Sequence, residues 1–323
     1  MQYSEMQLYG FNKIIKDYAK YPRILPLPCH MEHGWSAESC PLITDIVIDK
    51  PLMLVFSKRR EKAWKRKNTI PVVIMGSPFI HYRNMYKITQ KSDAKGTIVF
   101  PSHSTLYIKN KFSRIDFCKK LKKLPKEFQP ITICLFYLDY LDPISEIYHK
   151  MGFKVVTTGP KINNSLSFVK NFYDILSNNK YATSNDVGSY TFYAINMGLP
   201  FFLTGEAPLL LNKDLKDMNM GKQGRIEDFA IGRKSKKLFS TGPVKTISKT
   251  QSQFVIDELG IRDCLSPAKM RSLFWRYLKK ERFWIWLIIA YWLISFILFI
   301  GLGEIALKVF NKFKSSKNLY GIK

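Results

Sequence analysis

Acidic side chains are scarce in this sequence: 25 Asp and Glu stand against 51 Lys and Arg, which leaves a formal net charge of +26. Such an excess gives information about the partners of the protein and not about its fold. A basic surface attracts nucleic acid, anionic lipid head groups or phosphorylated substrates. The basic residues are spread along the chain and form no recognised RNA- or DNA-binding motif. We therefore expect an anionic membrane surface as a partner and no nucleic acid. A non-catalytic, membrane-tethered binder of polyanions stays open as an alternative to an enzyme.

Several motifs that mark enzyme classes are absent as well. The lack of GxxxxGK[ST] argues against a P-loop kinase or ATPase, and the lack of GxGxxG argues against a dinucleotide-dependent dehydrogenase. No serine stands in a GxSxG nucleophile elbow, which weakens a hydrolase. The five cysteines form no CxxC pair, and no Asp-x-Asp pair follows a predicted strand. We therefore expect no metal site, no disulfide framework and no cofactor.

Charge is absent from one long apolar run near the C-terminus. Residues 283–303 read FWIWLIIAYWLISFILFIGLG, and at about 1.5 Å per helical residue they cover about 31 Å, close to the hydrocarbon thickness of a bilayer. The run predicts a transmembrane helix, with a buried core helix as the alternative. Six basic residues precede it and four follow it: Lys269, Arg271, Arg276, Lys279, Lys280 and Arg282, then Lys308, Lys312, Lys314 and Lys317.

These flanks also indicate an orientation. The larger number of basic residues on the N-terminal side favours a cytoplasmic location for that side. The first residues show no signal-peptide pattern, which favours the same orientation. We expect a single-pass membrane protein whose catalytic part is cytoplasmic and lies against an anionic leaflet. A re-entrant segment with both ends in the cytoplasm is the alternative.

Helix-like and strand-like segments alternate through the rest of the chain. Strands are predicted at 51–57, 70–76, 96–104, 131–137, 153–159, 180–184 and 199–205, and helices at 58–67, 112–124, 142–152, 167–178 and 189–198. This alternation is typical of α/β proteins with parallel sheets and crossover helices. We expect a smaller α/β domain over 1–95, a doubly wound α/β domain over 96–211, a basic connecting region over 212–282, the transmembrane helix over 283–303 and a basic tail over 304–323.

Ligands of such sheets bind beyond the carboxyl ends of the strands, so polar residues there are candidate site residues. The first cluster, CHMEHGW at Cys29–Trp35, contains His30, Glu32 and His33. The two histidines are three residues apart and lack an evident further ligand, which favours a general base over a metal site. A histidine that only hydrogen-bonds within a turn is the alternative.

Three further clusters follow predicted strands. In the cluster MGSPFIHYR, the side chains of Ser77, His81 and Arg83 could bind phosphate or the acceptor. A plain strand-to-loop turn is the alternative. FPSHST holds hydroxyl and imidazole groups suited to phosphate oxygens: Ser102, His103 and Ser104. In TSNDVGSYTFYAINMG a polar turn opens a helix, and small residues at a helix N-terminus bind phosphate through backbone N–H groups. Ordinary N-capping of that helix is the alternative.

The second half of the sequence resembles a known family. A strand ending in PSHS, then ITICLFYLD, FKVVTTG and TSNDVGSYTFYAINMGLPFFLTGE, is similar to the C-terminal half of two-domain (GT-B-like) glycosyltransferases that build bacterial surface polysaccharides. Among them, the capsule, sialyl- and Kdo-transferase members and the teichoic-acid glycerophosphotransferases look most like this sequence. The resemblance covers about 96–206 well and Cys29–Arg83 loosely.

The resemblance implies two Rossmann-like domains, with the acceptor side over 1–95 and the nucleotide donor over 96–211. It implies donor binding by Ser102, His103, Ser104, Thr158, Gly159, Ser184, Asn185, Gly188 and Ser189. The pair His33–Gly34 looks like the His-Gly of the family's N-terminal domain, which implies an acceptor-side base at His33, with Glu32 as the other candidate. The sequence lacks the second histidine that the glycerophosphotransferases carry after the phosphate-binding helix.

The expected function is therefore that of a metal-independent glycosyltransferase. It would move a sugar, hexosyl or sialyl/Kdo-like, from a nucleotide sugar to a lipid-linked or polysaccharide acceptor. Glycerophosphate transfer from a nucleotide donor is the alternative within the same class of enzymes.

Overall fold

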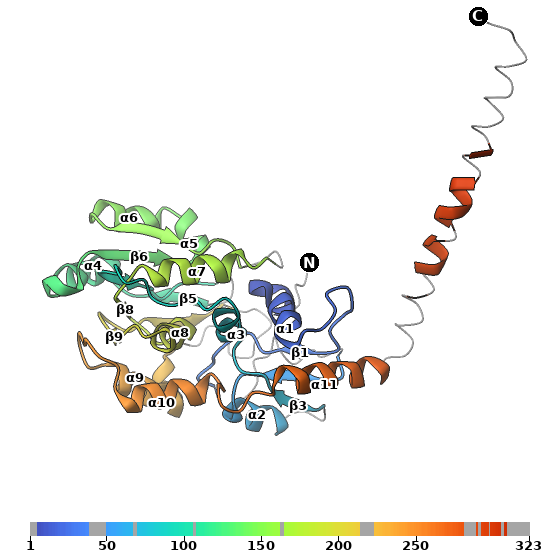
Figure 1. Ribbon diagram of the computed structural model, residues 1–323. Helices are drawn as coiled ribbons and strands as arrows, with labels where there is room; N and C mark the ends of the chain where they lie inside the picture. Colours follow the sequence, from blue (N-terminus) through green and yellow to red (C-terminus); the bar gives the residue numbers. More distant parts are fainter. Residues whose placement is uncertain are drawn as a thin grey trace, which may run out of the picture. The chain divides into compact units, whose positions relative to one another are not determined.

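The computed structural model describes residues 5–38, 50–66, 70–105, 108–161, 165–213 and 223–280, and, nearer the C-terminus, residues 289, 292–296, 298–304 and 307–308. The chain divides into two compact units, Met1–Arg271 and Ser272–Lys323. The first unit contains every described strand (Figure 1). It is the unit that carries the candidate site.

A five-stranded parallel sheet forms the C-terminal lobe of the first unit. Its strands are β4 (Thr97–Val99), β6 (Ile131–Leu135), β7 (Lys154–Thr157), β8 (Tyr181–Ser184) and β9 (Phe201–Leu203). Their spatial order is β7-β6-β4-β8-β9, and every neighbouring pair is parallel. The first strand along the chain is therefore central, as in a Rossmann-like sheet, and the direction of winding reverses between β4 and β8.

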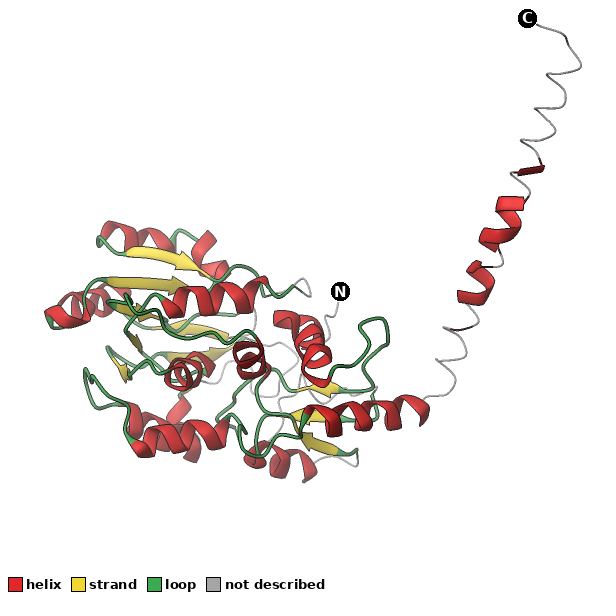
Figure 2. Ribbon diagram, viewed as in Figure 1, coloured by secondary structure: helices red, strands yellow, loops and turns green. Residues whose placement is uncertain are grey.

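The helices of this lobe fall within the predicted ranges, with one addition. They are α4 (Arg114–Lys122), α6 (Ile144–Lys150), α7 (Ser167–Ser177) and α8 (Ser189–Met197), and the short α5 (Tyr137–Leu141) was not predicted. Helix α4 begins where the Ser113 side chain accepts a hydrogen bond from Asp116 N. Its apolar residues Phe117 and Leu121 pack with Val99 of β4 in one buried cluster. Figure 2 shows the strands enclosed among these helices.

A second parallel sheet forms the N-terminal lobe. Its strands β1 (His30–Met31), β2 (Met53–Val55) and β3 (Val72–Ile74) lie in the order β1-β2-β3. Helices α2 (Lys58–Lys65) and α3 (Pro78–Met85) follow β2 and β3. Trp64 of α2 is fully buried against Met53 and Val55. The expected α/β class with parallel sheets is confirmed.

The N-terminal segment joins the two lobes. It consists of the 3-10 helix η1 (Glu5–Gly10) and helix α1 (Phe11–Ala19). Tyr9 N donates a hydrogen bond to the Lys161 carbonyl at 2.8 Å, and the Tyr9 ring meets Phe168 of α7 at 4.8 Å. Gly10 has φ +69, and a Cβ there would lie 2.8 Å from the Ser165 carbonyl oxygen, so only glycine allows this close approach.

The segment predicted as a basic connecting region contains regular strands and helices. It contributes β10 (Leu209–Asn212) and β11 (Gln223–Gly224), which form a small antiparallel sheet with β5 (Ile108–Lys111), and the helices α9 (Ala230–Phe239), α10 (Lys249–Glu258) and α11 (Pro267–Lys280). Two short 3-10 helices, η3 (Lys126–Phe128) and η4 (Ile226–Asp228), complete the elements. Phe239 of α9 is fully buried, and its ring centroid lies 5.7 Å from that of Phe201 on β9, so this part of the segment packs against the C-terminal lobe.

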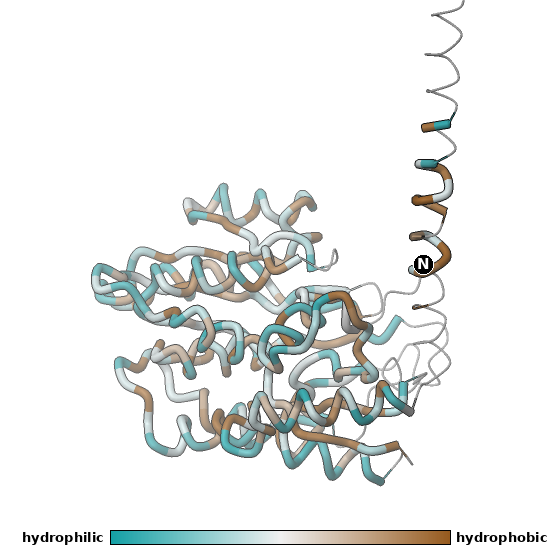
Figure 3. Tube along the Cα trace, turned by 45° about the vertical axis from the view of Figure 1, so that its right-hand side comes forward, coloured by the Kyte–Doolittle hydropathy of each residue, from teal (hydrophilic) through white to brown (hydrophobic). Residues whose placement is uncertain are grey.

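Residues 292–296 and 298–304 of the C-terminal unit are helical. Figure 3 shows these turns as largely hydrophobic, and Trp292, Phe296 and Phe299 are exposed. Among the described residues, no helix has both the length and the apolar character needed to span a bilayer. Much of the predicted transmembrane helix, including 283–288, lies outside the described residues.

Candidate functional site

The candidate site lies where the winding of the C-terminal sheet reverses. Strands β4 and β8 are parallel neighbours, so the loops that follow them leave the same edge of the sheet. Asn185, which is 2% exposed, accepts a hydrogen bond from Ser102 N at 2.8 Å and thereby ties the two loops together. Crevices at such switch points are the usual ligand sites of open α/β sheets. The predicted location of the site thus coincides with a defined topological feature.

The loop after β4 is organised by one residue of β5. The Nδ2 group of Asn110 donates to Ser102 Oγ at 2.5 Å and to the His103 carbonyl at 2.6 Å, and Asn110 N donates to Ser104 Oγ at 3.1 Å. Asn110 is 6% exposed. The hydroxyls predicted to bind phosphate therefore shape the loop, and Asn110 fixes its position.

His103 brings loops from three strands together. Its ring stacks on Phe136, which follows β6, with ring centroids 4.4 Å apart. Lys161, from the loop after β7, places its Nζ 5.7 Å from the centroid of the same Phe136 ring. Burial, with the like charges of Lys161 and His33, lowers the pKa of His103 to about 4. His103 is therefore a neutral imidazole at neutral pH.

The turn from β8 into α8 differs from the predicted phosphate site in its first residues. Ser184 is fully buried: its Oγ donates to the Phe100 carbonyl at 2.6 Å, accepts from Asp186 N at 3.1 Å and lies 2.9 Å from Tyr190 Oη. Ser184 and Asn185 thus act as structural residues of the turn. Gly188 and Ser189 are half-buried at the start of α8, and no acidic residue occupies the first turn of that helix. This helix end can therefore receive an anion.

Asp186 is a buried carboxyl in the same turn. Its Oδ1 accepts a hydrogen bond from Val187 N at 2.8 Å. Burial raises the pKa of Asp186 to about 6, against the opposing effects of the Val187 N–H and of Lys236 on α9. Asp186 lies within the sequence cluster that we singled out, although it was not among the predicted site residues.

The loop after β1 crosses from the N-terminal lobe to this helix end. Trp35 N donates to Ser189 Oγ at 3.3 Å, and a Cβ on Gly34 would lie 3.4 Å from the same oxygen. His33, the residue before Gly34, is close enough to His103 to lower its pKa, and its ring centroid lies 6.0 Å from that of Tyr9. The two histidines that were predicted from different halves of the sequence therefore lie within range of each other's charge.

The other candidate base, Glu32, is engaged elsewhere. Its carboxylate pairs with Arg60 of α2 at 2.7 Å and accepts a hydrogen bond from Phe56 N at 2.6 Å. Burial raises the pKa of the Glu32 carboxyl, and Arg60 and the Phe56 N–H oppose that rise. Both side chains of the ion pair are 1% exposed. Glu32 therefore serves the interior of the N-terminal lobe.

The loop after β7 was expected to contribute Thr158 and Gly159 to donor binding. Thr158 is buried and its carbonyl accepts a hydrogen bond from Asn171 Nδ2 at 3.2 Å. Gly159 adopts φ +85, and its N–H donates to Thr157 Oγ1 at 3.2 Å. This turn leads directly to Lys161, so it positions the ammonium group beside His103.

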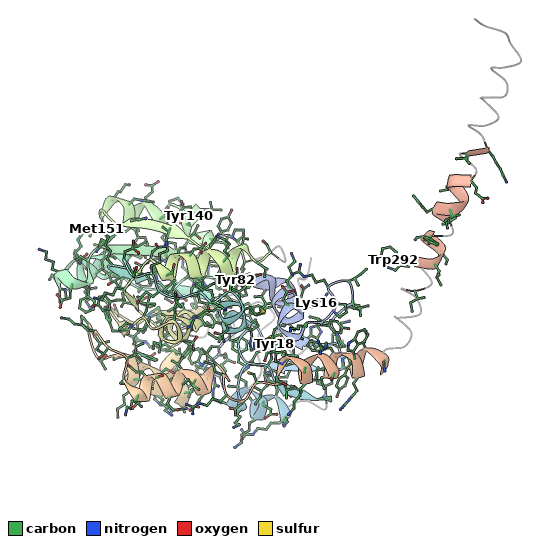
Figure 4. All side chains as sticks on the ribbon, viewed as in Figure 1. Lys16, Tyr18, Tyr82, Tyr140, Met151 and Trp292 are labelled. Carbon is green, nitrogen blue, oxygen red and sulfur yellow. The ribbon has the colours of Figure 1, made fainter. Side chains whose placement is uncertain are left out.

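The third predicted set lies away from the switch point. Ser77 donates to Tyr193 Oη at 3.0 Å, and Arg83 donates to the Asn196 carbonyl at 2.6 Å, so both connect α3 to α8. His81 pairs through Nε2 with the Met75 carbonyl at 2.6 Å, and its ring centroid lies 3.8 Å from that of Tyr18, whose place on α1 Figure 4 marks. Ser77 and Arg83 thus connect the lobes, and the polar groups of all three side chains have protein partners in this arrangement.

Two contributions to the site were not anticipated. Asn110 lies in IKNK, a polar strand without an apolar pattern, and Lys161 was one basic residue among many. The position of Lys161 directly after the Thr157–Pro160 loop was the available signal. Within the part of the chain that the structure describes, no three His, Cys, Asp or Glu side chains gather as metal ligands would.

No family model matches the sequence, and a search of curated proteins gives no match. Among solved structures, the wall teichoic acid polymerase TagF is similar. A variant soaked with CDPG superposes with a TM-score of 0.35 and 13% identity over 72% of this chain and 57% of the polymerase chain. A second TagF variant gives a TM-score of 0.33 and 12% identity over 72% and 58%. The chain thus spans less than two thirds of the polymerase chains that it matches.

Proposed function

We propose that this protein is a GT-B-like glycosyltransferase, which moves a sugar from a nucleotide-activated donor to an acceptor hydroxyl. The observation that supports this is the hydrogen bond from Trp35 N to Ser189 Oγ in the first turn of α8, which brings the loop that carries His33 to that helix end. A residue suited to accept a proton comes from one lobe, and a helix end suited to an anion comes from the other. That combination is what group transfer from a phosphate leaving group requires.

The donor phosphates would lie at the start of α8. The backbone N–H of Ser189 and the helix dipole provide the positive potential there, while the Gly188 N–H donates to Thr191 Oγ1 at 3.3 Å. Lys161 adds a full positive charge, and neutral His103 adds an imidazole that can donate or accept a hydrogen bond. The β1 loop touches Ser189, so it must move aside for the donor and return over it.

The chemistry follows from these placements. His33 takes the proton of the acceptor hydroxyl, and the acceptor oxygen attacks the anomeric carbon of the donor sugar. The bond between that carbon and the donor phosphate oxygen breaks, and the nucleotide leaves with the electron pair. Lys161 and the N–H groups of α8 stabilise the charge that develops on the nucleotide. Neither a metal nor a cofactor is part of this proposal.

The acceptor is proposed to be lipid-linked or a surface polysaccharide, at the cytoplasmic face of a membrane. The charge of +26 suits an anionic leaflet, and the uncharged run 283–303 suits an anchor. Cell fractionation followed by carbonate and detergent extraction tests the anchor. Release of the full chain by carbonate alone would contradict a membrane-spanning segment.

The donor site is tested by thermal unfolding of the detergent-solubilised chain with a panel of nucleotides and nucleotide sugars. A ligand at 100 times its Kd stabilises the folded state by about 2.7 kcal/mol, which is a readable shift. Selective stabilisation by one nucleotide supports the proposal and identifies the donor class. If a folded sample responds to none of them but binds nucleic acid with a steep salt dependence, the polyanion binder becomes the better description.

The base is tested with His33→Ala, and His149→Ala on the exposed surface of α6 is the matched control. We expect His33→Ala to lose turnover by a factor of about 100 or more while nucleotide binding is kept. Unchanged turnover would remove His33 from the mechanism. Analysis of the product then separates the two donor chemistries, because glycerophosphate transfer leaves phosphate in the product and glycosyl transfer does not.

A further inference from the structure

The loop that carries His33 is held by a charged residue from a distant part of the chain. Glu258, the last residue of α10, is 5% exposed and accepts a hydrogen bond from the Trp35 indole Nε1 at 2.6 Å. The Arg59 guanidinium of α2 meets the same carboxylate, with Nη2 2.7 Å from Oε2 and Nε 3.0 Å from each carboxylate oxygen. Glu258 therefore bridges α2 and the loop after β1.

Arg59 extends this bridge along the loop backbone. Its Nη2 donates to the Ser36 carbonyl at 2.6 Å, and its Nη1 donates to the Glu38 carbonyl at 3.1 Å. Charge-assisted hydrogen bonds of this kind fix both distance and direction. A segment without regular secondary structure is thus held at Trp35, Ser36 and Glu38.

Trp35 connects this network to the proposed donor site. Its indole lies 4.7 Å from the Phe192 ring of α8, and its backbone N–H donates to Ser189. On the other side of His33, Glu32 is fixed by the buried ion pair with Arg60. His33 and Gly34 therefore span the short interval between two anchored residues, Glu32 and Trp35.

We infer that Glu258 is a positioning residue for His33: through Trp35 and Arg59 it sets the place to which the loop returns over the first turn of α8. This inference rests on the proposed function, in which His33 is the base. It assigns a role in the reaction to α10, which lies in the region that the sequence indicated to be a mere connection. Removal of the carboxylate is expected to displace His33 without changing the groups that face the donor.

The geometry is tested without any substrate, by the rate at which diethyl pyrocarbonate modifies each histidine, read by mass spectrometry. Glu258→Gln removes the charge that holds Arg59, and Trp35→Phe removes the indole N–H while keeping an aromatic ring against Phe192. Both variants should raise the modification rate of half-buried His33 at least threefold and leave that of exposed His149 unchanged. Glu61→Gln, which removes an exposed ion pair with Lys65 on the same helix α2, is the matched control and should change neither rate.

A kinetic measurement separates positioning from a purely structural role. With the nucleotide sugar that stabilises the wild-type protein, Glu258→Gln and Trp35→Phe should lower kcat at least tenfold and change the donor KM less than twofold. An unchanged His33 modification rate in both variants, or an unchanged kcat at a temperature where both are folded, would overturn the inference. If no nucleotide stabilises the wild-type protein, the proposed function fails, whereas the labelling experiment still decides whether Glu258 holds the loop.

Discussion

The Arg60 guanidinium lies 2.7 Å from the Glu32 carboxylate, and both side chains are almost completely excluded from solvent. Removing one partner of such a pair leaves an uncompensated buried charge, which costs about 3–5 kcal/mol. We therefore expect Glu32→Gln to lower the free energy of unfolding by an amount of this order, measured by urea denaturation. Glu61→Gln, at the exposed pair with Lys65, should change it by less than about 1 kcal/mol. Equal effects of the two substitutions would contradict the structural role of Glu32.

Asn110 provides a test of the loop after β4. Asn110→Ala removes the two side-chain hydrogen bonds, to Ser102 Oγ and to the His103 carbonyl, and should cost about 1–3 kcal/mol of stability. It should also abolish most of the stabilisation that the nucleotide gives, because His103 loses its support. Lys109→Ala, at the exposed neighbouring position on β5, is the control. A full nucleotide-induced shift in Asn110→Ala would show that the loop is held by other contacts.

Burial of His81 predicts a loss of stability in acid. Burial lowers the pKa of His81 to about 4, so between pH 6.5 and 4 the unfolded chain binds more protons than the folded one. The stability due to this group is complete above pH 6.5 and falls as the pH falls toward 4, by about 2 kcal/mol at pH 5. In His81→Gln the drop in unfolding free energy between pH 7.5 and pH 5 should shrink by about that amount. His149→Gln, on the exposed face of α6, should leave the drop unchanged.

Two glycines with similar backbone angles should respond differently to alanine. Gly260 has φ +63, and a Cβ there would overlap the Phe56 carbonyl oxygen. Gly152 has φ +81, and no described heavy atom lies within 4 Å of the place where its Cβ would be. Both substitutions incur the cost of about 1–2 kcal/mol for a positive φ, and Gly260→Ala adds about 1–3 kcal/mol of overpacking. Equal destabilisation, measured by thermal unfolding, would contradict the close contact at Gly260.

All strands of the two parallel sheets except the short β1 could be predicted because buried parallel strands are nearly continuous apolar runs. Strands β4, β6, β7, β8 and β9 lie within the predicted ranges. Strand β5 could not be found in this way, because it reads IKNK and three of its four residues are exposed. Helix α10 was hidden by the basic composition of its surroundings, although Phe254, Val255 and Leu259 recur at helical spacing and are buried.

The sequence could single out the polar residues that follow strands but not the roles of their side chains. His33 and His103 were selected from their positions after strands, and the charge of His33 acts on His103. The same criterion selected Ser184 and Glu32, whose polar groups are satisfied inside the protein. Sequence position alone does not show whether a polar side chain after a strand points outward or inward. That is settled by tertiary partners such as Phe100 and Arg60, which are far away along the chain.

The hydrogen bond between Tyr9 and Lys161 has a consequence for biosynthesis. A ribosome releases the N-terminal lobe first, but Tyr9 of η1 gains its contacts with Lys161 and Phe168 only after those residues have emerged. The loop after β1 gains its hydrogen bond to Glu258 later still. During most of translation, the first helix and the loop that carries His33 therefore lack part of their tertiary contacts. A pause or truncation before residue 258 should yield a chain that is protease-sensitive at its beginning, far from the break itself.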